Sequence, residues 1–387
     1  MISRRNIARL FRKALADPGY ALRAARQRFR SYLSYLRSDG RSAPPETISL
    51  FLTFRCNLRC KMCGQWGPEG SARGYSPETL KSQLSREEIR ALIADVRGFR
   101  PNITLFGGEP LLHPEFAGIV EDIKAAGLRC NVITNATLLE RFAEPLVEFG
   151  LDEIIFSLDG PSEAHDEVRG VAGTFDRAMA GFGALQAAKE KSGKKLPKIN
   201  VTSVVFESSY ERLPELIPVA EQLGAGSLTI HHLIFYDRAT YDAHNELFER
   251  EFGTTCYDWE GFVVDALPEI DPEKVIEVRK RLLATPPRVP VAFYPNLTDA
   301  EVRAWYGGFA FEPASYSGRC KSPWMVAYVF PDGGVRPLHS MNFVAGNVRE
   351  ATFRDIWNND KYRRYRRTVK ECGRFPICSR CTELYRF

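Results

Sequence analysis

The sequence has no run of about 18 apolar residues, so we expect no transmembrane helix. Its N-terminal residues also lack the apolar core that is typical of a secretory signal peptide. Nine cysteines in 387 residues are too few for a disulfide scaffold, and an odd number fits metal ligation better than pairing. Together these features predict a cytoplasmic protein in a reducing environment.

Acidic residues are scarce in residues 1–45, although the whole chain carries a modest formal charge of +5. This segment shows two helical stripes of apolar residues, which are Ile7, Leu10, Phe11 and Ala14, and then Leu22, Ala25, Phe29, Leu33 and Leu36. A basic amphipathic helix pair can lie on an anionic membrane surface, here the inner face of a membrane. We favour the alternative, in which the helices pack on the main domain with their arginines outward. Aromatic residues do not alternate with the charges, so nucleic acid is not an expected partner.

Three closely spaced cysteines follow the first strongly apolar segment. Residues 47–54 are rich in β-branched and aromatic residues and are typical of a buried strand. Cys56, Cys60 and Cys63 come directly after it, so they lie on the loop that leaves the strand. Three such thiolates can converge on an iron–sulfur cluster and leave one iron open. Part of a zinc site, or unrelated buried thiols, would fit the same spacing.

From residue 47 the chain alternates strands and helices. The strands are expected at 47–54, 102–106, 128–133, 153–158, 199–206 and 228–235. Such an order predicts an α/β fold with a parallel sheet and right-handed crossovers. The pattern alone fits a doubly wound sheet or a full eight-fold barrel equally well.

Polar and glycine residues gather where these strands end. In parallel α/β proteins, ligands bind at the carboxyl ends of the strands. The residues at these positions are Gly107, Gly108 and Glu109 after the second strand, Asn135 after the third, Ser157 and Asp159 at the fourth, and His231 and His232 late in the sixth. The sequence therefore predicts that the catalytic and ligand-binding residues lie together on one face of the fold, at the carboxyl ends of the strands.

The cysteine spacing, followed by Gly107-Gly108-Glu109-Pro110 after the second strand, resembles the radical S-adenosylmethionine (SAM) superfamily. The resemblance implies a partial (β/α)6 TIM-like barrel over residues 46–235, holding a 4Fe–4S cluster on the three cysteines. In the family, one electron from this cluster cleaves SAM to a 5′-deoxyadenosyl radical, which takes a hydrogen atom from the substrate. The reducing partner would be a flavodoxin or ferredoxin.

The same resemblance implies which residues contact SAM. The glycines and Glu109 resemble the segment that holds the methionyl amine, and Ser157 and Arg169 resemble the pair at the carboxylate and ribose. Arginine suits a carboxylate because its fork binds it bidentately. A surface ion pair with Asp166 is the alternative for Arg169. The expected SAM-binding residues are Met62, Gly107, Gly108, Glu109, Asn135, Ser157 and Arg169.

Residues 320–387 resemble the auxiliary-cluster extension called SPASM, or its shorter form, twitch. They contain Cys320, Cys372, Cys378 and Cys381, a predicted hairpin around residues 331–334, and a helix expected at 353–368. The family usually has a cysteine after the hairpin, where this chain has His339. His339, Cys372, a substrate or water could complete one auxiliary iron–sulfur cluster in this small α+β domain. A zinc site is the alternative. Cys130 and Cys256 are expected to be plain thiols.

Residues 236–319 are interpreted as a linker with insertions, and the substrate is not determined by the sequence. Oxidation or cross-linking of a peptide or a small molecule fits the extension. An envelope lipid or glycan would use the N-terminal helices as an anchor. A non-catalytic iron–sulfur or zinc scaffold is the alternative to an enzyme, but the intact cysteine and glycine motifs argue against it.

Overall fold

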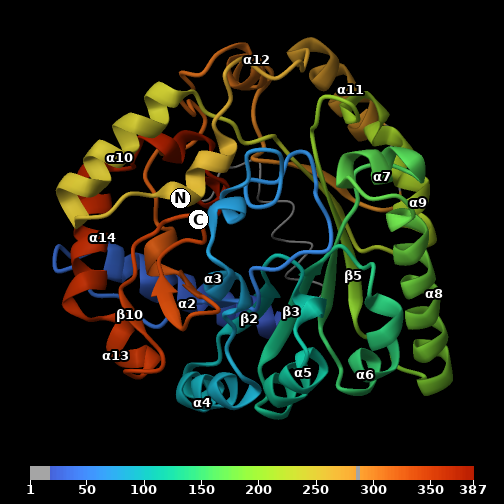
Figure 1. Cartoon of the computed structure of the whole chain (residues 1–387), viewed down its shortest axis with the longest axis horizontal. Coiled ribbons are helices and arrows are strands. Elements are labelled where there is room, and N and C mark those ends of the chain that lie inside the picture. Colours follow the sequence, from blue (N-terminus) through green and yellow to red (C-terminus); the bar gives the residue numbers. More distant parts are fainter. Residues whose placement is uncertain (1–17, 285–287) are drawn as a thin grey trace.

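The computed structural model describes residues 18–284 and 288–387. Within these residues the strands form one sheet in the order β10-β9-β8-β1-β2-β3-β4-β5-β6-β7 (Figure 1). All neighbours from β8 through β1 to β7 are parallel, and β9 and β10 add an antiparallel edge. The strands are β1 (Thr47–Phe51), β2 (Asn102–Phe106), β3 (Arg129–Thr134), β4 (Glu153–Ser157), β5 (Lys198–Val204), β6 (Leu228–His231), β7 (Val291–Tyr294), β8 (Val326–Val329), β9 (Gly334–Arg336) and β10 (Gly346–Asn347).

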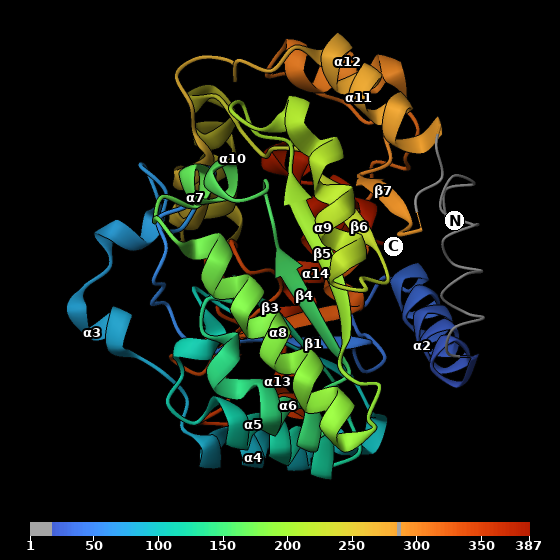
Figure 2. The same cartoon turned by 90° about the vertical axis from the view of Figure 1, so that its right-hand side faces the viewer.

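Helices cover the outer side of this curved sheet, so the predicted α/β class with an open, barrel-like parallel sheet is confirmed (Figures 1 and 2). Strand β1 is buried along its whole length, as expected for a strand with parallel neighbours on both sides. The helices are α2 (Pro18–Leu36), α3 (Pro77–Lys81), α4 (Arg86–Val96), α5 (Phe116–Ala125), α6 (Ala143–Glu148), α7 (Glu163–Arg169), α8 (Thr174–Ser192), α9 (Leu216–Gln222), α10 (Arg238–Phe252), α11 (Pro272–Ala284), α12 (Asp299–Gly307), α13 (Phe353–Trp357) and α14 (Asp360–Cys372).

The helix expected at 353–368 is divided into α13 and α14. The break falls at Asn358 and Asn359, and the Asn359 side chain accepts a hydrogen bond from the backbone N–H of Tyr362. A side chain that satisfies such an N–H starts a new helix, because the first N–H groups of a helix have no partner within it. The local capping preference of asparagine therefore overrides the continuous apolar periodicity.

The regions on either side of the six expected strands extend the same sheet. Strand β7 comes from the segment that we interpreted as a linker, and it pairs in parallel with β6. Strand β8 comes from the C-terminal extension and pairs in parallel with β1. Both edges of the six-stranded sheet are thus covered, which removes unpaired backbone groups that would otherwise be exposed. The C-terminal extension is consequently fixed next to the strand that carries the first cysteines.

Helix α2 packs against the C-terminal extension and leaves Arg23, Arg26 and Arg30 exposed, as in the interpretation we favoured, but its apolar stripe lies outside this contact. Leu22, Phe29, Leu33 and Leu36 are exposed, whereas Tyr35 is buried. The side of the helix that contacts the extension carries Ser31, Ser34 and Tyr35, which are buried. The apolar periodicity did not predict that this side would be the buried one. The first stripe, at Ile7 to Ala14, lies outside the described residues. In the part of the chain that the structure describes, no helix is long and apolar enough to cross a bilayer.

Candidate functional site

The first cysteine triad, Cys56, Cys60 and Cys63, lies on the loop that leaves β1, as predicted. Helix α7 holds this loop by its backbone, because the N–H of Lys61 donates to the carbonyl of Val168 at 2.9 Å. Two backbone N–H groups of the loop point at thiols, from Leu58 to Cys56 Sγ at 3.5 Å and from Trp66 to Cys63 Sγ at 3.4 Å. Such N–H···S contacts would tune the potential of a bound cluster.

Two thiols of this triad, those of Cys56 and Cys60, have raised pKa values in the metal-free protein. Burial raises the pKa of Cys56 to about 12, and it also raises the pKa of Cys60, although Arg169 opposes the shift at Cys60. A metal binds the thiolate, so loading this site with iron must release protons. The energy of the metal–sulfur bonds therefore has to exceed the cost of ionising two buried groups.

The two glycines after β2 allow the chain to pass close to the triad loop. A Cβ atom on Gly108 would lie 2.2 Å from the carbonyl oxygen of Arg55, the residue before Cys56. Gly107 has a φ of +151°, and a Cβ there would lie 2.7 Å from the carbonyl of Thr53. The sequence argument assigned these glycines to a ligand. The structure adds that they are needed for contact between two segments of the chain.

Glu109 is buried and organises its neighbours. Its carboxylate accepts hydrogen bonds from the Thr134 hydroxyl at 2.7 Å, the Asn135 N–H at 2.9 Å and the Leu111 N–H at 3.0 Å. Burial raises its pKa to about 7, and these hydrogen bonds oppose the shift. The Asn135 amide in turn donates to Asn57 on the cysteine loop at 3.0 Å. Glu109 therefore fixes the end of β3 against the first triad.

Arg169 lies at the end of α7 and turns into the barrel. It forms a buried ion pair with Asp159, and its Nη1 approaches Cys60 Sγ at 3.7 Å. The alternative of a surface pair with Asp166 is wrong, because Asp166 instead accepts the N–H groups of Gly173 and Phe175 at the start of α8. Among the described residues the buried Nε of Arg169 has no partner. A carboxylate bound beside the triad could accept that hydrogen bond.

The remaining expected residues lie at the same end of the sheet. Ser157 is the last residue of β4, and Met62 is half-buried against the core. His231 packs its ring against Tyr294, with the centroids 5.4 Å apart. His232 is a core residue instead, because it is fully buried, hydrogen-bonds the Tyr306 hydroxyl at 3.0 Å, and has its pKa lowered to about 3 by burial.

A second triad is formed by the C-terminal cysteines. Cys320, Cys378 and Cys381 line one cavity together with Met341 and Leu338. Burial raises the pKa of each of these thiols. Three neutral thiols that line one cavity fit a cluster whose irons take thiolate ligands.

The structure does not bring Cys372 to this cavity. It is the last residue of α14 and is exposed, and the neighbours that shift its pKa are Glu251, Glu371 and Arg250 rather than another cysteine. The helix turns this thiol toward α10 and solvent. Spacing along the chain could not reveal this, because the direction of a side chain depends on where the helix ends.

His339 also lies outside the lining of the cavity. Its ring packs between Trp259 and Tyr328, and its Nδ1 hydrogen-bonds the neighbouring Ser340 hydroxyl at 2.5 Å. Cys256, expected to be a plain thiol, is fully buried with its Sγ 3.7 Å from the sulfur of Met341. Among residues 18–284 and 288–387, no three Cys, His, Asp or Glu side chains converge tightly on one metal ion.

Two buried carboxylates were missed by the sequence analysis. Asp258 accepts from the Tyr75 hydroxyl and from Asn342, and pairs with Arg336 at 3.1 Å. Tyr75 follows the first triad, whereas Arg336 is on β9, so this network joins the two parts. Nothing in the sequence near Asp258 indicated the contact. Glu383, two residues after Cys381, could have been considered for its position alone, and it accepts from Ser322, Tyr328 and Arg386.

The fold and the sites define a class of protein, namely parallel α/β barrels with a cysteine triad after the first strand and a second triad in a C-terminal extension. The family model of the radical SAM superfamily matches residues 50–230, and that of the SPASM iron–sulfur cluster-binding domain matches residues 320–382. The chain belongs to the radical SAM superfamily and carries a SPASM domain.

Known proteins agree with this assignment. The chain is 26% identical to an AdoMet-dependent heme synthase of Methanosarcina barkeri, over 86% of this chain and 88% of that protein. It is also 26% identical to a tungsten-containing aldehyde ferredoxin oxidoreductase cofactor-modifying protein of Pyrococcus furiosus, over 87% and 86%. In fold it resembles Streptococcus suis SuiB bound to its precursor peptide SuiA, with a TM-score of 0.59, 14% identity, and coverage of 86% and 69%.

The protein is therefore an enzyme rather than a non-catalytic scaffold. Its cofactors are SAM and a 4Fe–4S cluster, and the SPASM domain carries an auxiliary iron–sulfur cluster. The residues present fit these groups, because each triad gathers three thiols that are at least partly buried, and Arg169 offers a buried donor without a partner among the described residues.

Proposed function

We propose that this enzyme oxidises a small organic molecule, of the kind handled in cofactor synthesis, after removing a hydrogen atom from it. The observation that carries the proposal is the placement of the two triads beside one strand pair. The first triad leaves the end of β1, and the second belongs to the extension whose β8 pairs with β1 in parallel. Two clusters held this way would lie in one rigid unit.

The relatives support a small molecule as substrate. The two curated relatives described above extend over most of this chain, and their names refer to heme synthesis and to cofactor modification. The likeness to SuiB concerns the fold alone, so it does not favour a peptide to the same degree. Oxidation or cross-linking of a peptide remains the second candidate for this reason.

On the SAM side, Arg169 would bind the carboxylate of SAM through the edge of its guanidinium that has no partner among the described residues. Asp159 would act as a positioning residue, because it holds Arg169 from the other side. Glu109 would position Asn135 and the glycine segment against SAM. Ser157 and Met62, at the same end of the barrel, would contact the ribose and the adenine.

A cluster held by the first triad would supply the electron for reductive cleavage of SAM, and a cluster held by the second triad would accept the electron that the substrate radical gives up. The chain's own part is to hold these groups and exclude water. The Tyr75–Asp258–Arg336 network would keep the C-terminal extension closed over the barrel. A flavodoxin or ferredoxin would be the reducing partner.

A labelled-extract experiment tests the substrate class. Reconstituted enzyme is incubated without oxygen with SAM, a reductant and extracts of cells grown in deuterated medium, separated into small-molecule and peptide fractions. Deuterium in 5′-deoxyadenosine after exposure to the small-molecule fraction supports the proposal. Transfer from the peptide fraction alone would overturn the substrate class while leaving the radical chemistry in place.

A further inference from the structure

Exposed apolar side chains of this protein gather on helix α2. Of the nine large hydrophobic side chains that are exposed in the described part of the chain, five belong to this one helix. With about 3.6 residues per helical turn, they fall on a single stripe along the axis. They are Leu22 (73% exposed), Phe29 (62%), Tyr32 (38%), Leu33 (45%) and Leu36 (56%).

A row of arginines lies beside this stripe. Arg23, Arg26 and Arg30 are exposed, and at about 100° per residue they follow the edge of the apolar stripe. The helix contains no aspartate or glutamate that would offset their charge. Arg28 is different, because it points the other way and pairs with Glu46 at 2.6 Å. The exposed surface of α2 therefore consists of an apolar stripe and, beside it, a row in which all charged residues are arginines.

The inner face of the helix is firmly held. Tyr35 packs edge-on against Trp324 with the ring centroids 4.9 Å apart, and the Gln27 amide donates to the carbonyl of Pro45 at 2.7 Å. Lys370 on α14 donates to the last carbonyl of the helix, that of Leu36, at 3.0 Å. The exposed stripe thus belongs to a docked helix.

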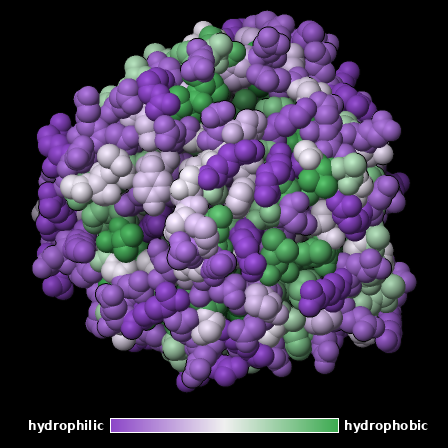
Figure 3. Space-filling view, viewed as in Figure 1, coloured by the Kyte–Doolittle hydropathy of each residue, from purple (hydrophilic) through white to green (hydrophobic). Residues whose placement is uncertain are grey.

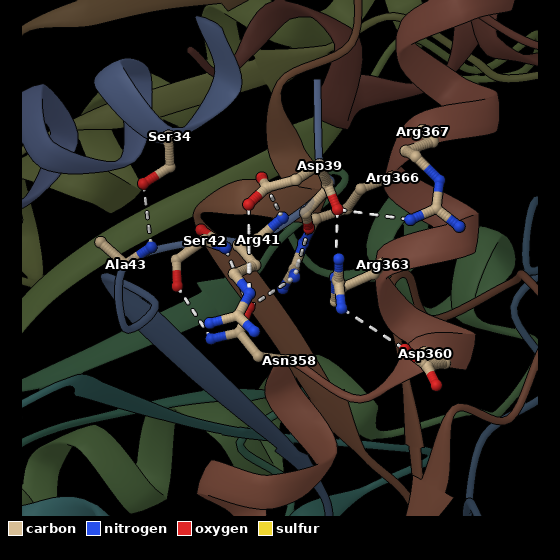
Figure 4. Close-up of polar contacts among 11 residues, drawn as sticks. Ser34, Asp39, Arg41, Ser42, Ala43, Asn358, Asp360, Arg363, Arg366 and Arg367 are labelled. Atoms are coloured by element: carbon tan, nitrogen blue, oxygen red, sulfur yellow. Dashed lines mark hydrogen bonds and ion pairs between the residues drawn. The ribbon is translucent and has the colours of Figure 1, made fainter. Parts of the chain in front are cut away.

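The loop after α2 is fastened to the C-terminal helices as well (Figure 4). The backbone N–H of Ser42 donates to Asn358 Oδ1 at 2.9 Å. The carbonyl of Asp39 accepts hydrogen bonds from Arg363 at 3.1 Å and Arg367 at 3.3 Å. These hydrogen bonds therefore fix α2 and the loop that follows it to the rest of the enzyme.

We propose that α2 binds an anionic bilayer surface, with the apolar stripe in the interface and the arginines on lipid phosphates. An interfacial helix of this kind combines a moderate apolar face with basic residues that attract anionic lipid. A second copy of this chain is a poorer occupant, because it would bring arginine rows of like charge together. Residues 1–17 are a poorer occupant for the same reason, since they are also basic.

The proposed membrane face lies opposite the active-site face. Figure 1 looks onto the face that carries α3, which follows the first triad, and α2 lies behind it. Figure 2 shows α2 and α3 at opposite edges of the molecule. An enzyme bound in this way would have the mouth of its barrel toward water. The membrane would then serve as an anchor, and an envelope lipid or glycan need not be the substrate. This inference does not depend on the proposed substrate class.

Vesicle flotation of the full-length chain tests the proposal. With vesicles of phosphatidylcholine mixed with phosphatidylglycerol the protein floats, and with phosphatidylcholine alone it floats far less. The variant Leu22→Ser/Phe29→Ser/Leu33→Ser loses binding by at least about tenfold, because it loses most of the buried apolar area. The matched control Leu267→Ser/Leu283→Ser, which alters exposed leucines elsewhere, binds like the parent protein.

A second variant covers the case in which the first one misfolds. Arg23→Gln/Arg26→Gln/Arg30→Gln keeps the apolar stripe and lowers binding to anionic vesicles by on the order of a hundredfold. Failure of the intact chain to float, or flotation of both variants equal to that of the parent protein, overturns the proposal. Loss of a dimer in light scattering on mutating the stripe, without vesicle binding, would assign the face to a second copy instead.

Discussion

Arg169 and Asp159 form an ion pair inside the barrel, with side chains 11% and 0% exposed, directly beside the thiol of Cys60. The pair joins the end of β4 to the end of α7, which also carries the backbone contacts to the cysteine loop. Its carboxylate is held further by the backbone N–H of Val204 at 2.9 Å. One buried charge pair thus links two strand ends and helix α7 to the first triad.

Breaking this pair from either side should destabilise the protein. Arg169→Leu leaves Asp159 buried without its cation, and Asp159→Asn leaves Arg169 without its anion, so each should lower the free energy of unfolding by about 3–5 kcal/mol. The double variant should recover most of that loss, because neither charge remains. Urea unfolding of the metal-free proteins measures this cycle. A loss in the double variant equal to the sum of the two single losses would show that the two charges do not stabilise each other.

The same variants separate stability from SAM binding. The double variant keeps the fold but lacks the guanidinium, so its affinity for SAM should fall by roughly 30- to 100-fold, as expected for a lost charge-assisted hydrogen bond. Isothermal titration of the reconstituted protein provides the measurement. Unchanged affinity would remove Arg169 from the SAM site.

Glu109 should make the metal-free protein less stable as the pH rises. Its pKa is raised by burial to about 7 in the folded state, so the folded protein keeps a proton that the unfolded chain has lost. The stability that this proton provides is present below about pH 4.5 and is lost as the pH rises to about 7, by up to about 3 kcal/mol. Unfolding curves across this range, compared with Glu109→Gln, measure the effect. Parallel pH profiles for the two proteins would contradict it.

Gly108 should be required for cluster binding at the first triad. Alanine at this position would place its Cβ against the backbone of Arg55, so Gly108→Ala should displace the cysteine loop and reduce the iron bound there. Gly183 in the middle of α8 is a matched control, since nothing lies within 4 Å of a Cβ there. Gly183→Ala should keep all iron and stabilise the fold by about 0.5–1 kcal/mol. Full iron content in Gly108→Ala would refute the close-contact argument.

Cys372 and Cys378 should behave differently although they are six residues apart. Cys378→Ser should remove the auxiliary cluster, because this thiol lines the cavity of the second triad. Cys372→Ser should leave the iron content unchanged, because this thiol is exposed on α14. Iron and sulfide analysis of both variants decides the matter. Loss of iron in Cys372→Ser would return it to the ligand set.

Local patterns predicted where many residues of the candidate site lie in the fold. The cysteine spacing, the glycines after β2 and the polar residues at strand ends depend on the period of the parallel sheet, which the apolar pattern determines. Glu88 shows the same for a helix start, because it forms a capping box with Ser85, three residues before it in the sequence. These features need only neighbours along the chain.

Features that depend on distant contacts were not predictable. The outward stripe of α2 follows from which side of the helix meets Trp324, nearly 300 residues away in sequence. The Asp258 network joins residues from three separate segments, and no spacing marks it. The separation of Cys372 from the second triad depends on how α14 packs. In each case tertiary packing determines which side chains are buried or brought together, and the apolar periodicity of a single sequence does not reveal that packing.

A metal analysis tests the central claim most directly. The chain is reconstituted anaerobically with iron and sulfide, alongside a Cys56→Ala/Cys60→Ala/Cys63→Ala variant and a Cys320→Ala/Cys378→Ala/Cys381→Ala variant. Two clusters on two separate triads predict about eight irons in the parent protein and about four in each variant. About four irons in the parent, falling to none when the first triad is removed, would contradict an iron–sulfur cluster on the second triad, and zinc in its place would identify the metal that the C-terminal cysteines hold.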